Sequence, residues 1–190
     1  MSLAALHDVP APAKINWFLH ITGRRADGYH LLQSVFMLID WADTLHFERR
    51  AEVLLRRHDL GPALPPEDLV LRAARALQAA SGTALGADIS VEKQVPWAAG
   101  LGGGSSDAAT TLLALNRLWG LHWPRERLLA LAAPLGADVP FFVGGRNALA
   151  EGVGERLTPV VVPRQWYAVV KPVANLPTAE IFSHPALVRN

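Results

Sequence analysis

The chain has 190 residues, of which 51% are hydrophobic, and it carries a formal net charge of +1. This length and composition favour a globular protein with one sizeable core. The 18 basic residues are scattered rather than gathered with aromatic residues, which argues against a nucleic-acid partner. Because the chain has no cysteine, disulfides, thiolate metal sites and cysteine nucleophiles are excluded.

The first eight residues lack the basic stretch and the long apolar core of a signal peptide. No uncharged apolar run approaches the ~20 residues that a membrane span requires. We therefore expect a cytoplasmic protein without a membrane partner.

The first predicted strand covers residues 13–21, where apolar and polar residues alternate. The alternation places Lys14 and Asn16 on one face, about 7 Å apart at ~3.3 Å per residue. These two side chains could hold a substrate oxygen, or they could belong to a solvated outer face. The pattern leaves both interpretations open.

A polar, glycine-punctuated turn over residues 22–30 carries Tyr29 and His30 side by side. Such residues suit either an exposed loop tip or a place where a flat heterocycle is stacked and hydrogen-bonded. Strands are predicted over residues 34–39 and 44–49, joined by a turn at 40–43, with a third over 53–56. A helix is then predicted from the Pro-Pro-Glu-Asp start signal at 65–68 to Ser81 and Gly82.

A strand over residues 88–94 leads into a glycine-rich loop that contains Gly100, Gly102, Gly103 and Gly104. Glycine permits positive φ, so successive backbone N–H groups can point into one concavity. The spacing of apolar residues from 108 to 119 predicts a helix whose positive N-terminal end faces the loop. The segment therefore predicts a phosphate site rather than a flexible linker.

This loop does not match three common phosphate motifs. A Walker loop needs a lysine after the glycines, and the dinucleotide fingerprint needs glycine where Ser105 and Asp107 stand. A protein kinase needs a downstream His-Arg-Asp segment, which is absent. Ser105 and Ser106 offer hydroxyl donors or magnesium ligands, and the cation of the site must come from elsewhere in the chain.

Asp138 stands alone in an apolar run over residues 135–143, between a helix predicted from Trp123 and Pro124 to about Pro134 or Gly136 and a predicted strand. A buried carboxylate is costly without a partner, so Asp138 either faces a cation, a metal or a hydrogen-bond network, or caps a helix or turn. A last apolar strand is predicted over residues 165–171, followed by a short helix with Phe182.

The order and spacing of residues 12–16, 25–30, 96–109, 135–140 and 177–182 resemble the 4-diphosphocytidyl-2-C-methyl-D-erythritol kinases of the GHMP kinase superfamily. The resemblance covers essentially the whole chain. It implies an α+β fold, the GHMP-kinase N-terminal domain, which is a ribosomal-protein-like βα fold with a mixed or antiparallel sheet packed by helices on one side.

The resemblance also implies a domain division. Residues 1–163 correspond to the ATP-binding domain, and residues 164–190 to the start of a C-terminal region whose remainder is absent. Family members continue into a ferredoxin-like domain with a third glycine-rich motif that closes the cleft. We therefore expect weak ligand binding by this chain and an exposed apolar face.

The implied activity is ATP-dependent phosphorylation of the 2-hydroxyl of 4-diphosphocytidyl-2-C-methyl-D-erythritol in the non-mevalonate isoprenoid pathway. ATP and Mg²⁺ are the implied cofactors, no protein metal ligand is assigned, and a monomer or weak homodimer is expected. By motif, the catalytic pair is Lys14 and Asp138. The substrate pocket corresponds to Asn16, Tyr29, His30, Thr178 and Phe182. The ATP-phosphate loop corresponds to Pro96, Trp97, Ala98, Ala99, Gly100, Leu101, Gly102, Gly103, Gly104, Ser105 and Ser106.

Two alternative functions stay open. Another GHMP kinase, acting on mevalonate, homoserine or galactose, would have no base for Tyr29, His30 and Phe182 to bind. A non-catalytic nucleotide-binding module would follow from the missing C-terminal lobe.

Overall fold

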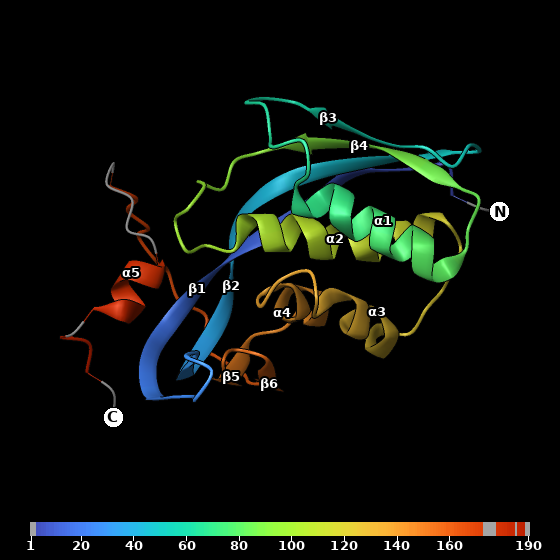
Figure 1. Ribbon diagram of the computed structural model, residues 1–190. Helices are drawn as coiled ribbons and strands as arrows, with labels where there is room; N and C mark the ends of the chain where they lie inside the picture. The colour runs from blue at the N-terminus through green and yellow to red at the C-terminus, as the bar shows by residue number, and fades with distance from the viewer. Residues whose placement is uncertain (1–2, 173–177, 185, 189–190) are drawn as a thin grey trace.

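The computed structural model describes residues 3–172, 178–184 and 186–188. Their strands form one six-stranded mixed sheet (Figure 1). The strands are β1 Ala5–Arg24, β2 His30–Arg50, β3 Leu55–Asp59, β4 Gly86–Glu92, β5 Ala148–Gly152 and β6 Arg156–Pro159.

Strand β2 is the centre of the sheet. One edge pairs with β1 along most of its length. The other edge pairs with β4 through residues 44–50 and with β5 through residues 32–36. Strand β3 extends the sheet from β4 in parallel, and β6 extends it from β5 in antiparallel orientation.

Strand β2 is continuous over 21 residues, so the predicted turn at residues 40–43 was wrong. Strand β1 pairs with β2 throughout this segment, with the register Pro10↔Thr44, Ala11↔Asp43 and Pro12↔Ala42. The sequence suggests a turn because it carries Asp40 and Asp43, but Asp43 is buried and its carboxylate accepts hydrogen bonds from backbone N–H groups after β4. A satisfied aspartate is compatible with the middle of a strand.

Strand β1 departs from the simple alternation predicted for residues 13–21. Register shifts between Pro12 and Lys14, and between Asn16 and Leu19, mark β-bulges. A bulge changes which side chains face the core, so Trp17 is 44% exposed and Leu19 is 41% exposed although both were expected on the buried side.

The helices are α1 Leu69–Ser81, α2 Gly103–Leu118, α3 Arg125–Ala132, α4 Val139–Gly144 and α5 Thr178–Ser183. Helices α1 to α4 cover one side of the curved sheet (Figure 1). Buried side chains of α2, such as Leu112 and Leu115, share a core with Phe47 and Ile89 of the sheet. Within the described part of the chain, no helix has the length and hydropathy needed to span a membrane.

Helices α1, α2 and α3 were predicted, although α1 begins at Leu69, later than the start signal at 65–68. The carboxylate of Asp68 caps α1 by accepting a hydrogen bond from the Leu71 backbone N–H at 3.0 Å. The strand predicted after Asp138 was wrong, because residues 139–144 form α4. A short apolar run is ambiguous between strand and helix, and here Pro140 in the first turn and left-handed Gly145 at the end favour a helix.

The strand predicted over residues 165–171 was also wrong, because this segment has no regular secondary structure. The Tyr167 hydroxyl lies 3.7 Å from the Met37 sulfur, while Trp166 and Val170 are exposed. A strand needs a neighbour for its backbone hydrogen bonds, and an apolar run in the sequence cannot supply one.

Candidate active site

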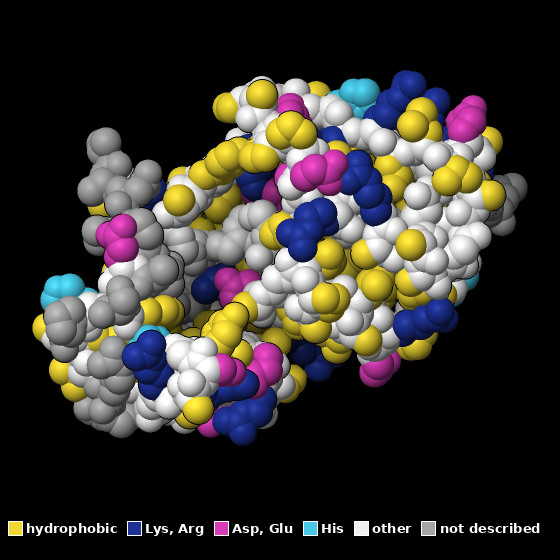
Figure 2. Space-filling model, viewed as in Figure 1, with side chains coloured by type: hydrophobic (Ala, Val, Ile, Leu, Met, Phe, Trp, Pro, Cys, Tyr) yellow, Lys and Arg dark blue, Asp and Glu magenta, His cyan; other side chains and the backbone are white. Residues whose placement is uncertain are grey.

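A cavity of about 780 Å³ lies where β1, the loop before α2 and the start of α4 meet. Lys14 and Asn16 of β1, residues 96–105 and Asp138 line it, together with Phe182 of α5. Figure 2 shows a hollow on this face of the molecule, with basic and acidic side chains together inside it. The structure thus brings most of the site residues predicted from sequence to one place.

The glycine loop, residues 94–102, joins β4 to α2 and bends sharply into the helix. Gly100 and Gly102 both have a φ of 72°, and Ala98 also has positive φ. Gly103 and Gly104, which would also permit positive φ, are the first residues of α2. A Cβ on Gly102 would lie 2.8 Å from the Phe142 ring and 3.2 Å from Lys14 Cγ, so the loop passes too close to its neighbours for a side chain.

The loop delivers the N-terminal end of α2 to the cavity, which Gly103, Gly104 and Ser105 line. The first N–H groups of a helix have no intrahelical acceptor, and the helix dipole places partial positive charge there. The Lys14 backbone N–H donates to the Leu101 carbonyl at 2.9 Å, which fixes the loop against β1. This geometry suits an anion such as a phosphate group.

The side chains of Lys14 and Asp138 both line the cavity and face each other. The distance from Lys14 Nζ to Asp138 Oδ2 is 3.5 Å, and Nζ also donates to Asn16 Oδ1 at 3.1 Å. The Lys14 ammonium lies 4.6 Å from the centre of the Phe36 ring, which adds a cation–π contact. A solvated outer face is excluded for Lys14, which is only 6% exposed.

Asp138 directly precedes α4, but its side chain makes no capping hydrogen bond to that helix. Its carboxylate is 30% exposed and is directed to Lys14 instead. Of the two interpretations that the sequence left open, the structure supports a carboxylate paired with a cation.

The two serines of the loop differ in position. Ser105 lines the cavity, whereas Ser106 is fully buried and is not among the lining residues. The Ser106 hydroxyl has no hydrogen-bond partner among the residues that the structure describes. Ser105 is therefore the better placed of the two to meet a ligand.

The residues matched to a base-binding pocket are only partly assembled. The rings of His30 and Phe182 stack with centres 5.2 Å apart. Tyr29 is 65% exposed in the turn before β2 and does not line the cavity. Thr178 is the first residue of α5, and its side chain lies outside the described residues.

Sequence reasoning missed a buried charge cluster beside the loop, formed by Asp43, Lys93 and Asp107. The Lys93 ammonium donates to both carboxylates, at 2.6 Å in the case of Asp107 Oδ2. Burial raises the pKa of Asp107 to about 7, and the Lys93 ammonium opposes that rise only in part. No pattern in the sequence could reveal this cluster, because its members come from β2, the end of β4 and α2.

Known proteins identify the family of the chain. A model described as the GHMP kinases N terminal domain matches residues 68–146. A 4-diphosphocytidyl-2-C-methyl-D-erythritol kinase from Methylibium petroleiphilum is 72% identical over 190 residues, which cover 100% of this chain and 66% of that protein. A protein of the same name from Paracidovorax citrulli is 61% identical over 192 residues, covering 99% of this chain and 67% of that protein. The chain belongs to the 4-diphosphocytidyl-2-C-methyl-D-erythritol kinase family.

Solved structures agree with this family. A crystal structure of 4-(cytidine 5'-diphospho)-2C-methyl-D-erythritol kinase matches with a TM-score of 0.72 and 47% identity, covering 81% of this chain and 55% of that chain. Methanococcus jannaschii mevalonate kinase matches with a TM-score of 0.60 at 14% identity, covering 85% of this chain and 56% of that chain, and so shares the fold alone. The α+β fold expected for the kinase family is therefore confirmed. The chain spans 66% of the length of the first curated relatives that it matches.

Proposed function

We propose that this chain is the ATP-binding part of a kinase that phosphorylates the 2-hydroxyl of 4-diphosphocytidyl-2-C-methyl-D-erythritol in the non-mevalonate isoprenoid pathway. The observation that carries the proposal is the ion pair of Lys14 and Asp138, 3.5 Å apart, beside a glycine loop that opens into α2. Residues 1–163 form the catalytic lobe, and residues 164–190 begin a further region of the protein. The protein acts in the cytoplasm as a monomer or weak homodimer.

In the proposed mechanism the donor phosphates lie against the loop and the start of α2. The backbone N–H groups and the helix dipole offset their negative charge. The Lys14 ammonium supplies the cation that the loop lacks and stabilises charge on the transferred phosphoryl group. Burial and the Phe36 ring hold this ammonium in place.

Asp138 acts on the acceptor alcohol. Its carboxylate orients the 2-hydroxyl and accepts the proton as the hydroxyl oxygen bonds to the γ-phosphorus and the bond to the ADP oxygen breaks. The transfer is direct, so no covalent enzyme intermediate is required.

The residues around the loop fit a magnesium ion only in part. Mg²⁺ prefers oxygen ligands and is commonly held by phosphates with one or two carboxylates. Ser105 and Asp138 offer such oxygens at the cavity, but the described residues contain no group of three or more His, Asp or Glu side chains that could hold a metal. When bound with ATP, Mg²⁺ would neutralise phosphate charge, and Ser105 is the residue that would hold it, because the Asp138 carboxylate is paired with Lys14 and serves the acceptor alcohol.

The base-binding part of the proposal rests on His30 and Phe182. Their stacked rings border the cavity through Phe182, and aromatic rings bind the flat face of a base. A mevalonate, homoserine or galactose acceptor would make no use of them, which favours a cytidine-containing acceptor.

The decisive experiment measures binding and turnover separately in the 190-residue chain. Calorimetry with a non-hydrolysable ATP analogue and with cytidine diphosphate should detect both ligands, and mixing ATP with the cytidylylated substrate should yield phosphorylated product. Lys14→Met should lower kcat by roughly 10²- to 10⁴-fold. Binding of the ATP analogue with no product at any enzyme concentration would favour a non-catalytic module, and failure to bind it would refute the proposal.

A further inference from the structure

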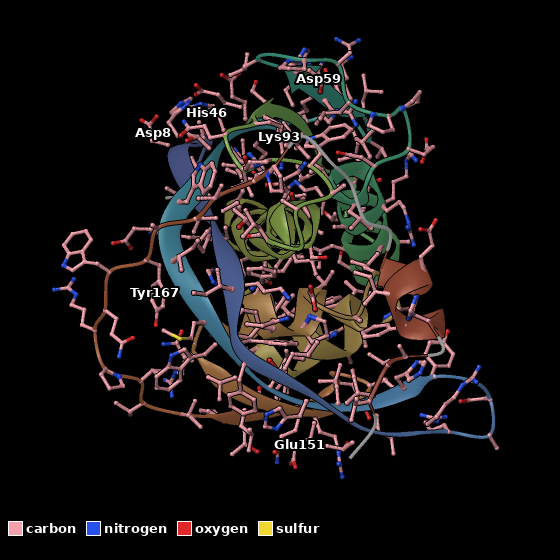
Figure 3. The ribbon with its side chains drawn as sticks, turned by 90° about the vertical axis from the view of Figure 1, so that its left-hand side faces the viewer. Asp8, His46, Asp59, Lys93, Glu151 and Tyr167 are labelled. Carbon is pink, nitrogen blue, oxygen red and sulfur yellow. The ribbon has the colours of Figure 1, made fainter. Side chains whose placement is uncertain are left out.

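The charge cluster of Asp43, Lys93 and Asp107 joins both ends of the glycine loop. Lys93 directly precedes the loop, and Asp107 lies in the second turn of α2, which directly follows it. Asp43 belongs to β2, the central strand. One ammonium therefore connects the beginning of the loop, the helix at its end and the sheet behind it. Figure 3 labels Lys93, which directly follows β4.

Asp43 contacts the loop at both ends. Its Oδ1 accepts hydrogen bonds from the backbone N–H groups of Gln94 at 2.6 Å and Val95 at 2.8 Å, the first two loop residues. Its Oδ2 accepts from Lys93 and faces the far end of the loop, because a Cβ on Gly103 would lie 3.3 Å from it. The cluster thus sets the separation between the two ends.

The loop requires such support. Three of its residues, Ala98, Gly100 and Gly102, have positive φ, and for Ala98 this conformation is strained. Strained backbone persists only where the surroundings hold it. The cluster residues are at most 9% exposed at the side chain, so their contacts compete little with water.

Stability alone does not account for the cluster. A buried ion pair gains little over apolar residues of similar volume, since desolvation offsets the attraction between the charges. The cluster also leaves Asp107 Oδ1 buried without a hydrogen-bond partner among the described residues, which is unfavourable. What the cluster contributes is therefore the geometry that it imposes on the loop.

We propose that Lys93, bridging Asp43 and Asp107, is the positioning residue of the donor-phosphate loop. It holds the two ends of residues 94–102 at the separation that presents the N-terminal turn of α2 to the phosphates. The inference rests on the proposed function, because it assigns this loop to a phosphate donor. Lys93 and Asp107 line the cavity, but the Lys93 ammonium donates to both carboxylates, so Lys93 acts through the loop backbone rather than on the acceptor alcohol.

The test uses the 190-residue chain with the double substitution Lys93→Met and Asp107→Leu. This variant removes the ammonium and one carboxylate and leaves Asp43 bonded to its two backbone N–H groups but without its cation, so Tm should fall, and exchange in the loop is therefore compared with exchange in the sheet and helices. Deuterium exchange of the Lys14 and Ser106 amides, which donate to the loop carbonyls of Leu101 and Gly102, should rise by about tenfold or more. Affinity for the ATP analogue should fall by about tenfold or more, while affinity for cytidine diphosphate stays unchanged.

Chemical rescue tests whether the Lys93 ammonium itself is required. The chain contains no cysteine, so a Lys93→Cys variant carries a single thiol. Alkylating that thiol with 2-bromoethylamine in the unfolded chain, followed by refolding, restores an ammonium at nearly the original reach. Loop protection and nucleotide affinity should both return.

A matched control removes another ion pair that joins the same two strands. Arg50 of β2 and Asp88 of β4 are 2.5 Å apart, away from the cavity. Arg50→Gln with Asp88→Asn should leave loop exchange and nucleotide affinity unchanged.

Unchanged loop exchange in the Lys93→Met, Asp107→Leu variant overturns the inference, and so does faster exchange spread evenly over the sheet and helices. A wild-type chain that binds no nucleotide overturns the proposed function instead, and the exchange comparison still decides whether the cluster holds the loop.

Discussion

Replacing Gly102 with alanine tests how closely the glycine loop packs against Lys14. Gly100 provides a matched control, because both glycines have a φ of 72°. An added Cβ at Gly100 meets nothing within 4 Å, whereas at Gly102 it would lie 2.8 and 2.9 Å from Phe142 ring atoms and 3.2 Å from Lys14 Cγ. The two substitutions therefore share the backbone cost and differ in the steric cost.

The expected losses follow from these contacts. Left-handed backbone costs alanine about 1–2 kcal/mol, so Gly100→Ala should lower the free energy of unfolding by about that amount. Overpacking adds about 1–3 kcal/mol, which brings the expected loss for Gly102→Ala to roughly 2–5 kcal/mol. Equilibrium denaturation in guanidinium chloride, followed by tryptophan fluorescence, measures both. Losses that agree within about 0.5 kcal/mol would refute the close packing of the loop.

Three further predictions concern single residues. Gly104→Ala places a methyl group in the first turn of α2, with Leu69 Cδ1 as its nearest neighbour at 3.9 Å. The substitution should raise the free energy of unfolding by up to about 1 kcal/mol, yet weaken binding of the ATP analogue in calorimetry. Unchanged binding would mean that the phosphates lie elsewhere. Phe182→Ala removes the stacking partner of His30. It should weaken cytidine diphosphate binding by about 3- to 10-fold and leave ATP-analogue binding unaltered. Equal losses of affinity for both ligands would contradict a base-specific role. Asp107 has a pKa raised by burial to about 7, above its ordinary value of 3.8, so the folded chain binds more protons than the unfolded chain between these values. Its contribution to the free energy of unfolding is therefore lost as pH rises through that window, by at most about 1.4 kcal/mol per pH unit, and Asp107→Asn should remove this slope in denaturation series at pH 5, 6 and 7.

Local patterns in the sequence predicted much of the fold. Helices α1 and α2 follow apolar periodicity, and each ends or begins at a glycine with left-handed backbone. The predictions were wrong where contacts with residues distant in the sequence determine the local structure. The acidic residues at 40–43 suggest a turn until their long-range contacts are known, and the apolar run over residues 165–171 predicts a strand that finds no neighbour in the sheet.

In the candidate site, too, some residues could be predicted from local sequence and others could not. The glycine loop, Lys14 and Asp138 can be recognised because each belongs to a distinctive stretch of sequence. Lys93 and Asp43 cannot, because an isolated lysine at a strand end and an aspartate within a strand are ordinary residues. The cluster that they form with Asp107 can be recognised only in the structure, where the sheet and α2 bring these side chains within hydrogen-bond distance.

The hydrogen bond from the Lys14 backbone to Leu101 has a consequence for motion in the site. The same residue holds the loop through its main chain and reaches Asp138 through its side chain. A displacement of the loop that keeps this hydrogen bond also displaces the residue that carries the ammonium. Under the proposed function, the distance between the donor phosphates and the Lys14 ammonium is therefore less sensitive to motion of the surrounding surface.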